Sequence, residues 1–440
     1  MQLYSTKNPK RVVDLKQAVF QSLPPDNGLY MPTTIPKLSP AFFANISTKS
    51  FAEIAFEVAA TLLGDSLPAD AVQQIVTETL SFPAPVQEVL PNRYVLELFH
   101  GPSMAFKDFG ARFMSRLMHY FLEQEQREIH ILVATSGDTG GAVALGFYEV
   151  PGIRVTILYP KGKVSPLQEQ QLTTLGKNIT ALEVEGTFDD CQRLVKTAFL
   201  DAEVNEKIQL SSANSINIAR LIPQTFYYFG AFAHLQQHGA TAAPVFSVPS
   251  GNFGNLTAGL IAWKMGLPVA HFVAATNVND IVPAYLKSGL FEPRPSQQTL
   301  SNAMDVGHPS NFERMLALFN REVEQMREMI SGYHFTDADT LATIQEVYDN
   351  SGYVMCPHTA IAYAGLKQYQ ENNPQAAQAP GVFLSSAHAC KFPNVYPAAL
   401  WEKIPLPPQV AQLQGREKQT VAMGTAYAEF KQWLLKQRPA

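Results

Sequence analysis

From Tyr94 onward, short apolar runs alternate with segments that repeat apolar residues at helical spacing. Residues 108–124 show the helical pattern, because Phe109, Phe113 and Leu117 fall on one face. The apolar runs that we predict as strands are 94–99, 129–134, 154–159, 179–184, 208–212, 245–248, 271–276 and 381–386. Strands that alternate with helices form mainly parallel sheets with right-handed crossovers, so the pattern predicts an α/β fold. Ligands of open α/β sheets bind beyond the carboxyl ends of the strands.

The part of the chain before Leu90 follows a different pattern, in which prolines separate short helical segments. Apolar residues recur at helical spacing in 51–62, and Gly64 follows as a stop signal. A chain of 440 residues is expected to form two or three domains. We predict a small N-terminal domain over 1–92, a smaller α/β domain over 93–235 and a larger α/β domain over 236–440.

Composition argues against several classes of function. The 33 basic and 38 acidic residues give a net charge of −5 without a long run of one sign, which argues against nucleic-acid binding and membrane-surface attachment. No apolar run is long enough to span a bilayer, and the N-terminus lacks the apolar core of a secretory signal. The three cysteines have no CxxC spacing, so neither a disulfide framework nor a zinc site is expected. We expect a cytoplasmic protein without a bound metal.

A glycine-containing loop, PSGNFGN at 249–255, follows one predicted strand and precedes a helix. Gly251 and Gly254 allow a ligand to approach the backbone, and the helix N-terminus offers free N–H groups and a positive dipole end. These features predict an anion site, most often for phosphate. The loop lacks the Gly-Lys-Ser/Thr ending of a nucleotide P-loop, which disfavours ATP and GTP. A glycine-rich turn that only packs is the alternative.

A second loop, TSGDTGG at 135–141, follows the strand predicted at 129–134. Its N–H groups suit a small carboxylate or phosphate. A dinucleotide site is the competing interpretation, but the spacing is not G-x-G-x-x-G. The next strand also ends in Tyr159-Pro160-Lys161, where a site for NAD needs an acidic residue. A tight structural turn is again the alternative.

Two further segments are weaker candidates. In SSAHACKF at 385–392, the Ser386 hydroxyl could reach a ligand, whereas His388 and Cys390 lack the further ligands that a metal site needs. In SSANSINIAR at 211–220, Asn214 and Ser215 could simply cap a helix. Arg220 follows in that helix, and surface arginines are common.

Lys107 lies in HGPSMAFKDFG, an apolar run just after a Gly-Pro turn. Ammonium groups are costly to bury, so this lysine either extends outward from a helix start or is kept inside for chemistry. A half-buried lysine together with a phosphate loop that lacks a nucleotide motif suggests pyridoxal 5′-phosphate. The aldehyde of that cofactor needs an amine for a Schiff base, and desolvation makes the amine easier to deprotonate. Ser386 could bind its ring nitrogen.

These segments resemble the threonine synthase family of fold type II pyridoxal-phosphate enzymes. HGPSMAFKDFG resembles the lysine motif G-P-T-x-A-F-K-D, SGNFGN the phosphate loop and TSGDTGGA the substrate-carboxylate loop. NSINIAR and AHACKF resemble two further blocks, and the similarity runs from the N-terminal domain almost to the C-terminus. Ser103 and Ser386 stand where threonine is usual. AHACKF replaces A-H-P-A-K-F and so lacks a rigid proline.

The resemblance implies that the active site lies in the cleft between the two α/β domains. It implies that O-phospho-L-homoserine and water are converted to L-threonine and phosphate, with Lys107 as Schiff-base lysine and proton shuttle. The implied cofactor-binding residues are Lys107, Gly251, Asn252, Phe253, Gly254, Asn255 and Ser386. The implied substrate-binding residues are Ser103, Ser136, Gly137, Asp138, Thr139, Asn214, Ser215, Arg220 and Lys391. Asp138 is expected to point away from the substrate carboxylate.

Two other interpretations stay open. A related phospholyase that eliminates phosphate and releases a 2-oxo acid would share the early chemistry, so only the products distinguish it. Outside this enzyme class, the chain could be a dinucleotide-binding oxidoreductase or a non-catalytic α/β binding protein. We expect a monomer or a homodimer that acts on a small molecule.

Overall fold

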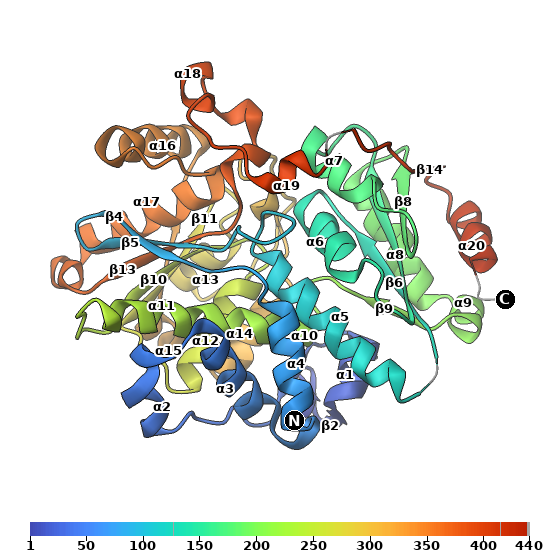
Figure 1. The fold of residues 1–440 in the computed structure, drawn as a ribbon, viewed down its shortest axis with the longest axis horizontal. Coiled ribbons are helices and arrows are strands. Elements are labelled where there is room, and N and C mark those ends of the chain that lie inside the picture. Colours follow the sequence, from blue (N-terminus) through green and yellow to red (C-terminus); the bar gives the residue numbers. More distant parts are fainter. Residues whose placement is uncertain (126, 414, 438–440) are drawn as a thin grey trace.

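The computed structural model describes residues 1–125, 127–413 and 415–437. Its N-terminal part forms a three-stranded antiparallel sheet, in the order β2-β1-β3, with helices beside it (Figure 1). The elements are β1 (Gln2–Ser5), β2 (Asn8–Asp14), α1 (Leu15–Gln21), β3 (Tyr30–Pro32), α2 (Pro40–Asn45), α3 (Phe51–Leu63) and α4 (Ala69–Thr79). Helix α3 begins with a reciprocal cap between Ser50 and Glu53 and ends at Gly64, as the sequence predicted.

A six-stranded sheet in the order β12-β11-β10-β13-β5-β4 lies at the centre of the larger half of the molecule. Its strands are β4 (Val86–Leu90), β5 (Arg93–Glu97), β10 (Val245–Pro249), β11 (His271–Thr276), β12 (Ile330–His334) and β13 (Gly381–Ser385). All neighbours pair in parallel except β4 with β5. Every residue of β11 and β13 is buried, as expected for parallel strands covered on both faces.

A five-stranded parallel sheet in the order β14-β8-β7-β6-β9 forms the other half. Its strands are β6 (Ile129–Ala134), β7 (Ile153–Pro160), β8 (Ile179–Val184), β9 (Leu210–Ser212) and β14 (Val421–Met423). The strand pairing crosses the predicted domain boundaries at three points. Strand β4, in the segment predicted as the N-terminal domain, pairs with β5 in the six-stranded sheet. Strand β5, expected in the smaller domain, pairs with β13 in the six-stranded sheet, and β14 returns from the C-terminal part to pair with β8. Such pairing joins distant segments, and local pattern does not encode it.

Helices follow most strands and cover both sheets (Figure 1). Those of the first half are α5 (Lys107–Glu123), α6 (Asp138–Phe147), α7 (Pro166–Thr173), α8 (Phe188–Leu200), α9 (Ala202–Lys207), α10 (Ile218–Leu221) and α11 (Phe226–Gln237). The later ones are α12 (Gly254–Lys264), α13 (Ile281–Ser288), α14 (Phe312–Leu318), α15 (Val323–Met329), α16 (Asp337–Ser351), α17 (Pro357–Asn372), α18 (Ala398–Trp401), α19 (Pro408–Ala411) and α20 (Tyr427–Lys436). Among the helices of the described residues, none is both long and apolar enough to cross a bilayer.

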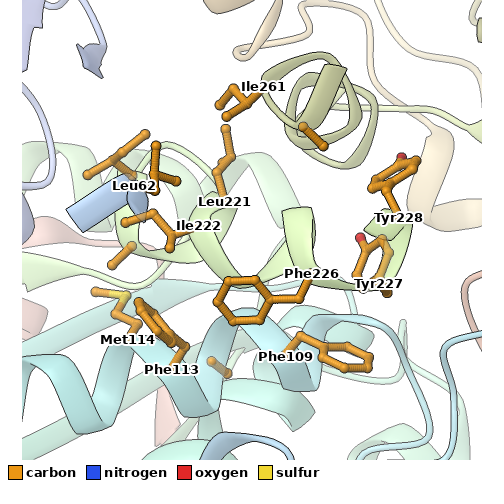
Figure 2. Close-up of a cluster of buried hydrophobic side chains, with 14 of the residues drawn as sticks. Leu62, Phe109, Phe113, Met114, Leu221, Ile222, Phe226, Tyr227, Tyr228 and Ile261 are labelled. Carbon is orange, nitrogen blue, oxygen red and sulfur yellow. The ribbon is translucent and has the colours of Figure 1, made fainter. Parts of the chain in front are cut away.

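A buried aromatic cluster fixes the start of α5, the helix that Lys107 begins. Figure 2 shows Phe109 and Phe113 of α5 facing the segment that carries Phe226 and Tyr227. The ring centroids of Phe113 and Phe226 lie 6.0 Å apart, and those of Phe109 and Tyr227 lie 5.3 Å apart, both edge to face. Because Phe109 is only two residues from Lys107, this packing restricts where the lysine can lie.

Candidate active site

The predicted site residues lie just beyond the carboxyl ends of five strands, β5, β6, β9, β10 and β13. The loops after β5 and β13 lie side by side, because Ala105 and Ala387 form an isolated bridge. The Phe106 N–H donates to the carbonyl of Ser386 at 2.8 Å, and the His388 N–H donates to the carbonyl of Met104 at 3.1 Å. The Lys107 loop is therefore attached to the loop that carries Ser386.

Lys107 is half-buried at the first position of α5. Burial lowers the pKa of its amine to about 8; the Asp138 carboxylate opposes this, and the cations of Lys391 and Arg220 add to the lowering. No side-chain hydrogen bond or ion pair engages its ammonium within the described part of the chain. An amine with this pKa is partly deprotonated near neutral pH, as a nucleophile and proton shuttle must be.

The loop between β6 and α6 requires glycine at position 137. Gly137 has φ 143°, and a Cβ there would lie 2.6 Å from the side chain of Gln168. The Thr135 hydroxyl accepts the N–H groups of Gly137 and Gly140 at 3.0 and 2.9 Å, which fixes the turn. Ser136 is exposed and Thr139 half-exposed, so both remain accessible to a ligand.

Asp138 forms a buried ion pair with Lys391, which the sequence did not predict. Its Oδ1 lies 2.6 Å from Lys391 Nζ, with side chains 5% and 0% exposed, and also accepts from Gln168 Nε2 at 3.0 Å. Burial alone would raise the pKa of Asp138, but the charges of Lys391 and Lys107 and the two hydrogen bonds outweigh it and lower the pKa below its usual range. Lys391 also donates to the carbonyl of Ser103 at 2.8 Å. A role for Lys391 at the substrate phosphate stays a prediction.

The loop between β10 and α12 contains two glycines, one at a position with no room for a Cβ and one at a position with room for it. A Cβ on Gly251 would lie 2.8 Å from the Ala303 carbonyl oxygen, so no side chain fits there. A Cβ on Gly254 would meet only ordinary contacts, the nearest at 3.4 Å, so packing does not require that glycine. Phe253 caps α12 in the left-handed region, with φ 61°. Its side chain is buried in the core, which leaves its backbone for a ligand.

The two asparagines of this loop have different surroundings. Asn255 is buried, and its Oδ1 accepts the hydroxyls of Tyr227 and Tyr228 at 2.7 and 2.8 Å, the two tyrosines labelled in Figure 2. Its Nδ2 has no partner among the described residues. Asn252 is exposed, and its Oδ1 accepts from the Ser310 hydroxyl at 3.2 Å.

Arg220 is buried beside the start of α5, not on the surface. Its guanidinium donates to the carbonyls of Ala213 and Lys107, whereas Nε has no partner in the described part of the chain. Burial lowers the pKa of Arg220 to about 10, and the Asp108 carboxyl opposes the change. The buried Oδ1 of Asn214 also lacks a described partner. Ser215 is fixed through its carbonyl, which accepts from Arg314.

Comparison with known proteins now places the chain. Residues 75–385 match the pyridoxal-phosphate dependent enzyme family, 2–80 the threonine synthase N terminus and 359–433 the threonine synthase C-terminal family. A threonine synthase of Escherichia coli (strain K12) is 44% identical over 412 residues, 94% of each chain. One from Haemophilus influenzae is 44% identical over 436 residues, 99% of this chain and 100% of its own. The chain belongs to the threonine synthase family.

Solved structures of threonine synthases agree. The Escherichia coli structure superposes with a TM-score of 0.90 at 41% identity, and the pyridoxal-phosphate-bound Brucella melitensis structure with 0.91 at 34%, each over 100% of both chains. The predicted family, fold type II architecture, enzyme class and cofactor are confirmed. Membership of this family argues against the dinucleotide-binding and non-catalytic alternatives.

The side chains of this threonine synthase family member fit pyridoxal phosphate. Lys107 would supply the amine, the Gly251–Asn255 loop would offer a helix N-terminus to the phosphate, and Ser386, which is 8% exposed, would offer a hydroxyl to the ring nitrogen. Buried polar atoms normally have hydrogen-bond partners. Those in these segments without a partner among the described residues are Ser103 Oγ, Asp108 Oδ1, Asn214 Oδ1, Arg220 Nε and Asn255 Nδ2. No group of three or more His, Cys, Asp or Glu side chains in the described ranges could bind a metal.

Sequence reasoning missed one residue of this region, His358. It is the second residue of α17, 2% exposed, and the charges of Asp138, Lys107 and Lys391 act on its ring. A histidine at the start of a mostly apolar helical run, HTAIAYAGL at 358–366, is the only signal that the sequence offers. Nothing in that pattern shows that the helix start contacts Ala303 and Ser385.

Proposed function

We propose that the chain converts O-phospho-L-homoserine and water to L-threonine and phosphate. The observation that supports the proposal is that the structure offers two separate groups of residues suited to anions, one of which contacts Lys107 through Arg220. The Gly251–Asn255 loop offers one to the cofactor phosphate, and the buried Arg220 with Asn214 offers the other to the substrate phosphate. A doubly charged group entering a partly dry site needs a cation of its own.

Bound pyridoxal phosphate supplies an electron-accepting ring that makes the Cα and Cβ protons of an amino acid easier to remove. The Lys107 amine then takes and returns those protons, since a pKa of about 8 lies near the working pH. We assign the substrate carboxylate to the N–H groups of Ser136 and Thr139, in the loop that turns at Gly137. Because Lys391 neutralises the charge of Asp138, the Asp138 side chain does not repel the substrate carboxylate. Ser103 adds a buried hydroxyl next to this loop.

Domain division and assembly are part of the proposal. We assign the active site to the region where the loops of the two α/β sheets meet, with the N-terminal sheet as a separate small domain. A cytoplasmic location and a monomeric or dimeric state remain predictions.

The products separate this proposal from the phospholyase alternative. With O-phosphohomoserine as substrate, we expect threonine and phosphate to appear in equal amounts, because water adds at Cβ before the product leaves. Amino-acid analysis and a phosphate assay measure both. Dominance of 2-oxobutyrate and ammonia would replace the proposed activity with elimination.

Arg220→Ala is expected to lower kcat/KM by one to two orders of magnitude, since charged hydrogen bonds contribute about 1.5–3 kcal/mol each. Cofactor absorbance should persist. Arg220→Lys keeps the charge but loses the planar pair of donors, so we expect an intermediate loss. The control is binding of a substrate analogue without phosphate, which should be insensitive to both substitutions. If both ligands lost affinity equally, Arg220 would have a structural role, and Lys391 would become the candidate for the substrate phosphate.

A further inference from the structure

His358 carries a buried hydrogen-bond donor that the described residues leave unused. Its Nε2 accepts the N–H of Ala303 at 3.2 Å, so Nε2 has no proton. Burial lowers the pKa of His358 to about 4; the Asp138 carboxylate opposes this, and the Lys107 and Lys391 cations add to it. The ring is therefore neutral, with its proton on Nδ1. Nδ1 is buried and has no partner among the described residues.

The position of the ring connects it to the cofactor phosphate loop. The backbone of Ala303 packs closely against Gly251. A Cβ at position 251 would lie only 2.8 Å from the Ala303 carbonyl oxygen. The hydrogen bond from Ala303 to His358 thus joins the imidazole to the segment that packs on this loop. Phe392 covers the ring, with centroids 5.2 Å apart.

The neighbouring residue connects the same helix start to the Ser386 loop. The Thr359 hydroxyl lies 2.8 Å from the hydroxyl of Ser385, the residue before Ser386. Helix α17 therefore begins between the two segments proposed to bind the cofactor phosphate and its ring nitrogen. The charges of Lys107 and Lys391 contribute to lowering the pKa of His358.

None of the charged groups that act on His358 is hydrogen-bonded to it among the described residues. Lys107 and Lys391 are donors, and Asp138 Oδ1 already accepts from Lys391 and Gln168. A buried N–H without an acceptor is strongly disfavoured, and buried donors in proteins are almost always paired. A bound molecule in the site can supply such an acceptor.

We propose that His358 is a cofactor-binding residue whose Nδ1–H donates a hydrogen bond to bound pyridoxal phosphate. The inference rests on the cofactor dependence of the family, and not on the identity of the substrate. Arg220 and Asn214 remain for the substrate phosphate, so the two contacts do not compete.

Two substitutions test the roles of the two ring nitrogens separately. His358→Gln places a polar atom near Nε2, so it retains an acceptor for Ala303 and loses the Nδ1 donor. His358→Asn places an amide N–H near Nδ1, so it retains the donor and loses the contact with Ala303. Equilibrium dialysis of each holoenzyme gives the dissociation constant of pyridoxal phosphate. We expect His358→Gln to raise this constant about tenfold or more, and His358→Asn to stay within about threefold of the wild type.

A matched control is His130, another buried histidine, in β6, whose Nε2 pairs with the Thr156 hydroxyl at 2.7 Å. His130→Gln should leave the dissociation constant unchanged. The inference is overturned if His358→Gln binds the cofactor as tightly as the wild type, or if the Gln and Asn variants weaken it equally. Turnover of O-phosphohomoserine plays no part in this measurement, so failure of the proposed reaction would be a separate result.

Discussion

Lys107→Ala is expected to lower turnover of O-phosphohomoserine by at least about three orders of magnitude and to remove the absorbance of the lysine-linked cofactor. The substitution takes away both the amine that binds the cofactor covalently and the group that moves protons at the substrate, and proton transfer alone contributes roughly 10²–10⁴-fold. Visible spectra before and after borohydride, together with a threonine assay, measure the two effects.

The fold of the variant should persist, because the lost amine is one whose charged form burial disfavours. The denaturation midpoint should therefore not fall. Lys107→Arg is the matched variant: it keeps the positive charge but cannot deprotonate, so we expect it to be as inactive as Lys107→Ala. Added methylamine should restore part of the activity of the alanine variant. A Lys107→Ala protein with wild-type absorbance would place the cofactor on another residue.

Much of the fold is predictable because it is locally encoded. The strands predicted at 129–134, 179–184 and 271–276 coincide with β6, β8 and β11 at both ends, since apolar runs between turn residues have few alternative structures. The candidate loops follow β5, β6, β9, β10 and β13. Each lies where a parallel strand ends, and parallel strands bring their carboxyl ends to one edge.

The remaining features depend on contacts between distant segments. Nothing local marks β5 as a neighbour of β13, or β14 as a neighbour of β8. Lys391 and Ser103 are 288 positions apart in the sequence, yet they are hydrogen-bonded. The sequence motifs predict Asp138 and Lys391 as site residues, but only the folded structure shows that the two form an ion pair.

Lys391→Met is expected to lower the free energy of unfolding by roughly 3–5 kcal/mol near neutral pH, because it leaves the Asp138 carboxylate buried without its cation. Asp138→Asn should also destabilise, since Lys391 then keeps only neutral acceptors such as the Ser103 carbonyl. The double variant removes both charges, so its loss should be smaller than the sum of the single losses. Urea denaturation of the four proteins gives the coupling. Additive losses would mean that the pair contributes no mutual stabilisation.

The pH dependence tests the same ion pair independently. In the folded wild type the pKa of Asp138 lies below its value in the unfolded chain, which is about 4. The ionised carboxylate therefore stabilises the fold fully above about pH 4, and this stabilisation is lost as the pH falls through the folded pKa. Without Lys391, burial raises the pKa of Asp138 in the folded protein. The contribution of Asp138 to the free energy of unfolding is then fully present at low pH, where the carboxyl is protonated, and is lost as the pH rises through the folded pKa. The stability difference between the wild type and Lys391→Met should therefore be largest near neutral pH and shrink toward pH 5. The double variant has no carboxyl at this position, so its difference from Asp138→Asn should not follow that trend. A constant difference for Lys391→Met would mean that Lys107 alone keeps Asp138 ionised.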